Sequence, residues 1–74
     1  MTFDKVKEVI VDTINCAEED VTIEATLKDT LGMDSLDAME VSMALEEAFD
    51  LTIDEEALVK FVTVKDIVDF IDAQ

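Results

Sequence analysis

Apolar residues recur along this chain at every third or fourth position, which is the spacing of α-helices. The first such run occupies residues 2–15. Its apolar face collects Phe3, Val6, Ile10 and Ile14. The last run begins at Thr63, and Asp66 three positions later completes the pattern of a helix N-terminal capping box. Its predicted buried side chains are Val64, Ile67, Val68 and Ile71. No segment alternates well enough to predict a β-strand.

The helix predicted from Ser35 to Phe49 differs from the others because it carries two apolar stripes. The stripe predicted to face the core consists of Ala38, Val41, Leu45 and Phe49. The second stripe lies on nearly the opposite face and consists of Leu36, Met39 and Met43. It is flanked by the carboxylates of Glu40, Glu46 and Glu47. One stripe is enough to bury a helix against a core, so we expect the second stripe to be largely exposed.

A long connection of residues 16–34 precedes this helix, and its apolar residues show no sustained period. We expect them to pin the connection to the core. Gly32, the only glycine, stands where a backbone bend with positive φ would be useful. Asp34 and Asp37 resemble a second capping box. A short helix with acidic residues in its first turn is predicted at about 54–60. The fold expected for residues 1–74 is all-α: a single domain forming a small antiparallel bundle of three main helices plus one short helix.

The charge of the chain is strongly acidic, with 20 Asp and Glu against 5 Lys and Arg and a net charge of −15. This balance argues against binding to nucleic acid or to an anionic membrane, because phosphate contacts need Lys and Arg. It favours basic protein partners. The sequence contains no apolar run of about 18 residues and no signal-peptide pattern, so we expect a cytoplasmic protein without membrane insertion. We also expect it to be a monomer.

Catalytic and metal-binding chemistry finds little support in these residues. The chain has no histidine and one cysteine, so neither a Ser–His–Asp triad nor a usual zinc or iron–sulfur site can be built. A twelve-residue calcium loop from Asp29 to Glu40 fails, because Leu31 and Met33 occupy ligand positions. Weak, non-specific divalent binding by the carboxylates is still expected. Cys16 is interpreted as a packing residue whose acidic neighbours raise its pKa.

Ser35 and the second stripe each have an ordinary structural interpretation. A serine at the start of a helix is usually a cap, and an apolar stripe usually packs within its own chain. Here the opposite stripe already supplies the core face, and a domain this small has little left to cover a second one. An exposed apolar stripe rimmed by acids is typical of a docking surface. Methionine at two of its three positions suits a surface that meets several partners.

The residues around Ser35 also resemble a known family. The sequence Asp34-Ser35-Leu36-Asp37 follows Leu31-Gly32 and precedes Glu40 and the stretch from Met43 to Phe49. Ile53, the acidic short helix, Lys60 and Thr63-Val64 continue the same pattern. Together they closely resemble acyl carrier proteins, over nearly the whole chain, and most of all the free-standing type II fatty-acid synthesis kind. Met33, Ser42 and Asp54 depart from the family's common residues.

The resemblance implies a covalent 4′-phosphopantetheine on Ser35, transferred from coenzyme A by a carrier protein synthase, that is, a phosphopantetheinyl transferase. The arm would hold acyl groups as thioesters, and the protein itself would not be an enzyme. The implied partners are ketoacyl synthases, reductases, dehydratases and acyltransferases with basic docking patches.

The same resemblance assigns surfaces to these tasks. The partner-binding residues would be Asp34, Leu36, Asp37, Met39, Glu40, Met43, Glu46 and Glu47. The acyl-chain pocket would be lined by Leu45, Ile53, Leu58, Phe61 and Ile67. A polyketide-type carrier and an unmodified acidic helical interaction module are the alternatives that the sequence leaves open.

Overall fold

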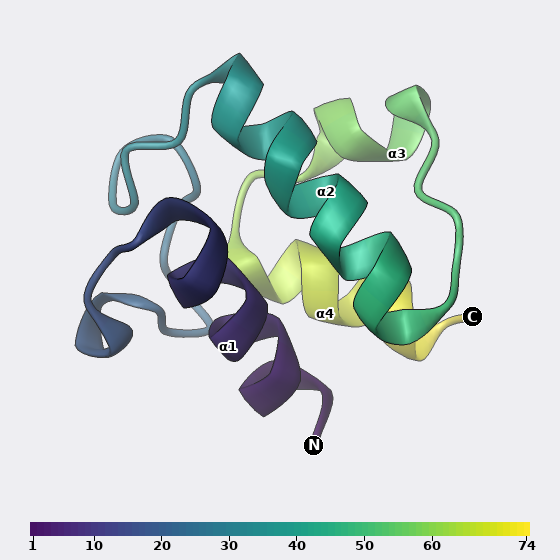
Figure 1. Ribbon diagram of the computed structural model, residues 1–74, viewed down its shortest axis with the longest axis horizontal. Coiled ribbons are helices and arrows are strands. Elements are labelled where there is room, and N and C mark those ends of the chain that lie inside the picture. The colour runs from purple at the N-terminus through teal and green to yellow at the C-terminus, as the bar shows by residue number, and fades with distance from the viewer.

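Four α-helices and one 3₁₀ turn make up the computed structural model, which describes all residues from Met1 to Gln74. They are α1 (Thr2–Ile14), the 3₁₀ turn η1 (Glu18–Asp20), α2 (Ser35–Phe49), α3 (Glu55–Lys60) and α4 (Val64–Asp72). Helix α1 packs against α2 and α4, and it runs roughly opposite to α2 (Figure 1). The only β-type pairing is an isolated bridge between Thr26 and Thr63. The all-α prediction, with three longer helices and one short one, is therefore confirmed.

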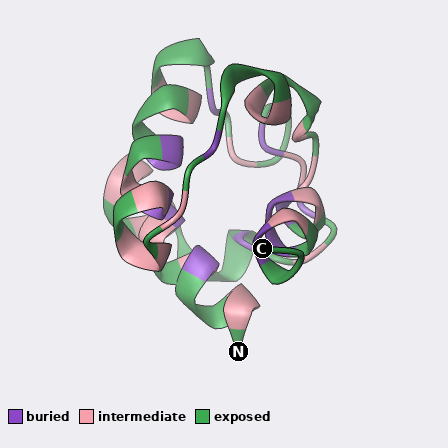
Figure 2. Cartoon of the chain, turned by 90° about the vertical axis from the view of Figure 1, so that its right-hand side faces the viewer, coloured by how far each residue is buried: buried purple, intermediate pink, exposed green.

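The core is built from the apolar faces that the helical spacing predicts. Its most completely buried side chains are Val6, Ile10, Val21, Leu45, Val64 and Ile67. Figure 2 shows buried residues on the helices and also on the connecting segments. Phe3, Ile14 and Phe49 are only partly buried, because each lies at the end of a helix where the core gives way to solvent. Lys5 covers the exposed side of Phe49, with its Nζ 5.1 Å from the ring centre.

Acidic and hydroxyl side chains close the N-termini of the last three helices. At α2, the Asp37 N–H donates to Asp34 Oδ1 over 2.8 Å, and the Asp34 N–H donates back to Asp37 Oδ2 over 3.4 Å. Thr63 and Asp66 form the same reciprocal box at α4. Bonds from the backbone N–H groups of Thr63 and Val62 lower the pKa of Asp66. Both capping boxes match the sequence-based prediction, while Asp54 caps α3 from outside the helix.

The connection between α1 and α2 is fixed to the start of α4 by backbone hydrogen bonds. The Leu27 N–H donates to the Val62 carbonyl over 2.9 Å, and the Lys65 N–H donates to the Ile23 carbonyl over 3.0 Å. Gly32 has a φ of 67°, in the left-handed region that the sequence analysis expected there. These bonds place the residues just before α2 against the rest of the domain.

Cys16 lies just after α1 and is partly buried. Burial raises the pKa of the Cys16 thiol, with a smaller contribution from the charge of Asp20. The predicted direction of the pKa shift is correct, but its main cause is desolvation rather than the acidic neighbours.

None of the helices has the length and apolar character needed to span a membrane.

Candidate functional site

Ser35 is the first residue of α2 and is exposed to solvent. Its neighbour Asp34 accepts the capping hydrogen bond, and no hydrogen bond engages the Ser35 hydroxyl. The chain contains no histidine, so no imidazole can act as a general base for this hydroxyl. The arrangement presents a free, unactivated hydroxyl at the end of a helix. It suits a serine that another protein modifies better than a nucleophile of this protein.

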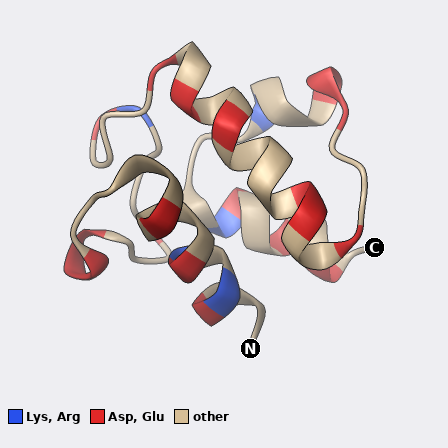
Figure 3. Cartoon of the chain, in the orientation of Figure 1, with Lys and Arg blue, Asp and Glu red and all other residues tan.

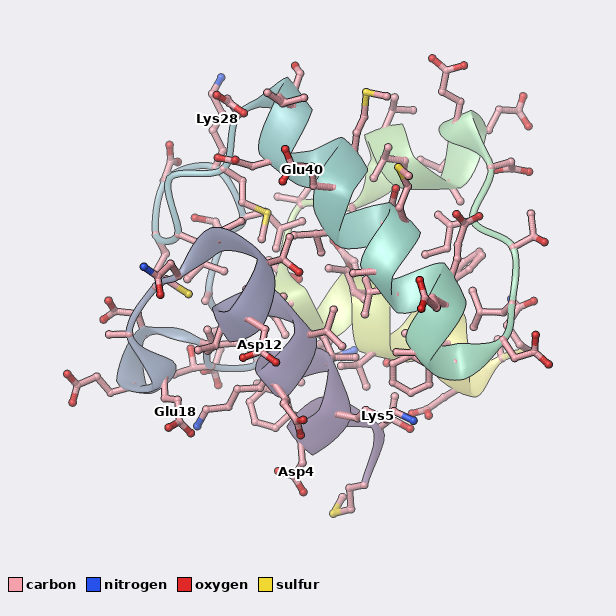
Figure 4. The ribbon with its side chains drawn as sticks, in the orientation of Figure 1. Asp4, Lys5, Asp12, Glu18, Lys28 and Glu40 are labelled. Carbon is pink, nitrogen blue, oxygen red and sulfur yellow. The ribbon has the colours of Figure 1, made fainter.

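A groove of about 630 Å³ opens beside Ser35. One wall comes from the connection before α2, the second from the first turns of α2, and the third from the end of α3 and the residues after it. Lys28 is its only cationic lining residue, and it lies near the start of α2 in Figure 4. Two exposed apolar residues, Val59 and Val62, form part of the wall opposite α2. A flexible arm attached to Ser35 would have space in this groove.

An apolar cavity lies deeper, between α2, α3 and α4, with a volume of about 10 Å³. That is barely the space of one water molecule. It is lined by Leu27, Met33, Ala38, Val41, Ser42, Leu45, Leu58, Phe61 and Ile67. The Ser42 hydroxyl donates to the Met39 carbonyl over 2.9 Å, so the cavity wall exposes no polar atom.

Four of the five predicted pocket residues line this cavity, namely Leu45, Leu58, Phe61 and Ile67. Ile53 does not line it, although the residue is buried in the core. Its backbone N–H is held by the last turn of α2, and this directs the residue to another part of the core. Ser42, which departs from the family's common residues, also lines the cavity. Met33 and Leu27 come from the connection, where no helical period marks the inward positions.

The second stripe of α2 is exposed, as predicted. The exposed fractions of Leu36, Met39 and Met43 are 62%, 55% and 64%, whereas Val41 and Leu45 on the opposite face are buried. Figure 3 shows acidic residues along the visible side of α2 and no basic residue there. The structure therefore leaves a solvent-facing apolar stripe among carboxylates, with no part of this chain covering it.

The acidic residues around the stripe differ in how far they are already engaged. Glu40 and Glu47 are exposed, and their carboxylates form no ion pair or hydrogen bond within the chain. Glu46 is partly buried, and its Oε2 accepts the Ile53 N–H over 2.8 Å. This bond ties the last turn of α2 to the segment that leads into α3. Nothing in the sequence spacing indicated this structural role for Glu46.

Comparisons with known proteins agree with this geometry. Residues 4–71 match the family model described as a phosphopantetheine attachment site. An acyl carrier protein of Clostridium perfringens (strain SM101 / Type A) is 46% identical over 69 residues, covering 93% of this chain and 91% of that protein. An acyl carrier protein of Petrotoga mobilis (strain DSM 10674 / SJ95) is 44% identical over 69 residues, covering 93% of this chain and 81% of that protein.

The match to the phosphopantetheine attachment family places this helical domain, with its exposed serine at a helix start, in the class of phosphopantetheine-bearing carriers. With these matches, the chain belongs to the acyl carrier protein family. The residues present fit the prosthetic group of that family, because the free hydroxyl of Ser35 opens directly onto a groove with space for it.

Proposed function

We propose that Ser35 is the attachment residue for 4′-phosphopantetheine and that the domain carries acyl groups between cytoplasmic enzymes of fatty-acid biosynthesis. The observation that carries this proposal is the exposed Ser35 hydroxyl, which has no hydrogen-bond partner although it stands at a helix start. When bound, the group supplies a thiol that forms thioesters. The chain has no histidine to activate the Ser35 hydroxyl, so we infer that it is a non-catalytic carrier and that a phosphopantetheinyl transferase provides the chemistry of attachment.

The exposed stripe of α2 supports docking to partners with basic patches, for which we propose ketoacyl synthases, reductases, dehydratases and acyltransferases. Leu36, Met39 and Met43 offer an apolar centre, and Glu40 and Glu47 offer unpaired charges beside it. Each exposed ion pair contributes at most about 1 kcal/mol. The affinity of each complex is therefore modest and falls with added salt, which suits a carrier that must leave one enzyme to reach the next.

We also infer that the cavity behind Ser35 shelters part of the acyl chain. Leu45, Leu58, Phe61 and Ile67 provide an apolar wall without a polar atom exposed in it. An alkyl chain leaving water for such a wall gains hydrophobic free energy with each methylene that it buries.

The attachment is tested by intact mass after incubation with coenzyme A, Mg²⁺ and a phosphopantetheinyl transferase. The wild-type protein should gain the mass of one phosphopantetheine, and Ser35→Ala should gain none. Ser42→Ala is the matched control, because Ser42 is the only other serine and is buried. It should be modified like the wild type. If the wild type gains no mass, the domain is an unmodified acidic interaction module; a gain that survives Ser35→Ala places the attachment on another residue.

Docking through the stripe is tested by Met43→Glu. We expect the apparent KM of a ketoacyl synthase for the loaded carrier to rise by about tenfold, equivalent to about 1.4 kcal/mol, because a charge replaces an apolar contact. The helical circular dichroism should stay unchanged, since Met43 is 64% exposed. Thr52→Glu adds the same charge at an exposed loop position outside the stripe and should change the KM far less. Equal effects of the two variants would instead assign the loss to net charge alone.

A further inference from the structure

The groove beside Ser35 and the internal cavity are adjoining spaces that share part of their walls. Five residues line both: Leu27, Met33, Ala38, Leu58 and Phe61. Any chain that starts at Ser35 and ends in the cavity must pass between these side chains. These five residues therefore form the boundary between the groove and the cavity, and the mobility of their side chains decides whether an acyl chain can enter the cavity.

Met33 differs from the other four boundary residues in position and in chemistry. It lies two residues before Ser35, and its side chain is buried, with 6% of the residue exposed. Its backbone is fixed, because the Met33 N–H donates to the Leu27 carbonyl over 2.9 Å. The side chain is unbranched and has three rotatable bonds, so it changes shape more easily than leucine or phenylalanine. At the mouth of the cavity the Met33 side chain can therefore change its shape while its backbone stays in place.

The size of the cavity makes such a movement necessary. Its volume of about 10 Å³ leaves no room for a chain of several methylenes. Close-packed interiors hold no spare space that such a chain could use without displacing a side chain. The groove outside measures about 630 Å³ and has room to receive a displaced methionine side chain. Because the Met33 backbone is fixed, a movement of its side chain toward the groove frees only part of its former place, and the remainder still limits the entering chain.

We propose that the Met33 side chain is the gate between this groove and the cavity, and that its bulk limits the length of straight acyl chain that the cavity accepts. The proposal rests on the attachment at Ser35 and on the acyl shelter proposed above. It assigns chain-length selection to a residue of the connection before α2. Shortening Met33 removes the three side-chain heavy atoms beyond Cβ, and this should admit about three more chain carbons.

The gate is tested by thermal unfolding of the carrier loaded with straight saturated acyl groups, from butanoyl to dodecanoyl. In the wild-type protein we expect the melting temperature to rise with chain length and then stop rising when the cavity is full. In Met33→Ala the unloaded protein should melt lower, because a core side chain is truncated, but the rise should continue for about three more carbons. Met39→Ala deletes the same atoms from an exposed position outside the cavity and should keep the wild-type limit.

Each outcome decides between the proposals. A limit at the same chain length in the wild type and in Met33→Ala overturns the gate. If Met33→Ala does not fold, Met33→Val makes a smaller cavity and should move the limit by about one carbon, and no movement there also overturns the gate. If mass spectrometry shows full loading but no acyl group changes the melting temperature in any variant, both the gate and the acyl shelter fail while the attachment at Ser35 stands. Absence of any loading overturns the attachment itself.

Discussion

Leu45→Ala should lower the free energy of unfolding by about 3 kcal/mol, within the range measured for truncating buried leucines. Leu45 is 1% exposed and packs in the centre of the core. A domain of 74 residues has a total stability of roughly 4–11 kcal/mol, on the scale of about 0.05–0.15 kcal/mol per residue. The expected loss is therefore a large share of the whole, and the variant should unfold at a clearly lower urea concentration than the wild type.

Urea unfolding followed by helical circular dichroism measures this loss. Met43→Ala is the matched comparison, because it truncates a side chain of similar size two positions earlier on the same helix, where the residue is 64% exposed. It should cost less than about 0.5 kcal/mol. The contrast tests the assignment of one α2 stripe to the core and the other to solvent. Similar losses for the two variants would contradict that assignment.

Added salt should raise the melting temperature by about 10 °C or more between very low ionic strength and molar NaCl, given a shift of about 4–8 °C per kcal/mol for domains of this size. The chain has a net charge of −15, and only two ion pairs, Met1 with Asp4 and Lys65 with Asp69, relieve its self-repulsion. Salt shortens the range of that repulsion from about 30 Å at 0.01 M to about 3 Å at 1 M. Millimolar Mg²⁺ should act in the same direction by binding weakly across the carboxylates.

A charge reversal separates this effect from general salt effects on hydrophobic burial. Glu19 lies exposed in η1 between Glu18 and Asp20, and its side chain makes no hydrogen bond. Glu19→Lys should raise the melting temperature by several degrees at low salt, on the same scale of about 4–8 °C per kcal/mol, and this advantage should nearly vanish at molar salt. If neither salt nor Glu19→Lys changes the melting temperature, the surface charges do not destabilise the folded state.

The helices and their caps were predictable because local rules determine them. Val6, Ile10, Val64 and Ile67 recur with the helical period, and every one of them is fully buried. The boxes at Asp34 and Thr63 are read from residues only three positions apart. The connection of residues 16–34 was different. It is held by hydrogen bonds to the start of α4 and to the residues just before it, more than thirty positions away, and no periodic signal in the sequence indicates such a contact.

The candidate site likewise has one part that local sequence rules predict and another part that they do not. Ser35 and the exposed stripe follow from position within one helix, and the structure places them as the spacing indicated. The cavity is assembled from four separate segments, so its membership depends on tertiary packing. Ile53 is therefore absent from the lining, while Met33 and Ser42 are part of it. Glu46 illustrates the same point, since its bond to the Ile53 N–H bridges seven positions across a turn.

Asp34, and not Ser35, accepts the hydrogen bond that caps α2. Because Asp34 holds the helix cap, the serine hydroxyl contributes nothing that the folded chain would lose on forming a phosphodiester bond. The domain can therefore fold to completion first and be modified afterwards. Under the proposed attachment at Ser35, the unmodified, modified and loaded forms would share one fold, and the acyl group could be exchanged repeatedly without refolding of the domain.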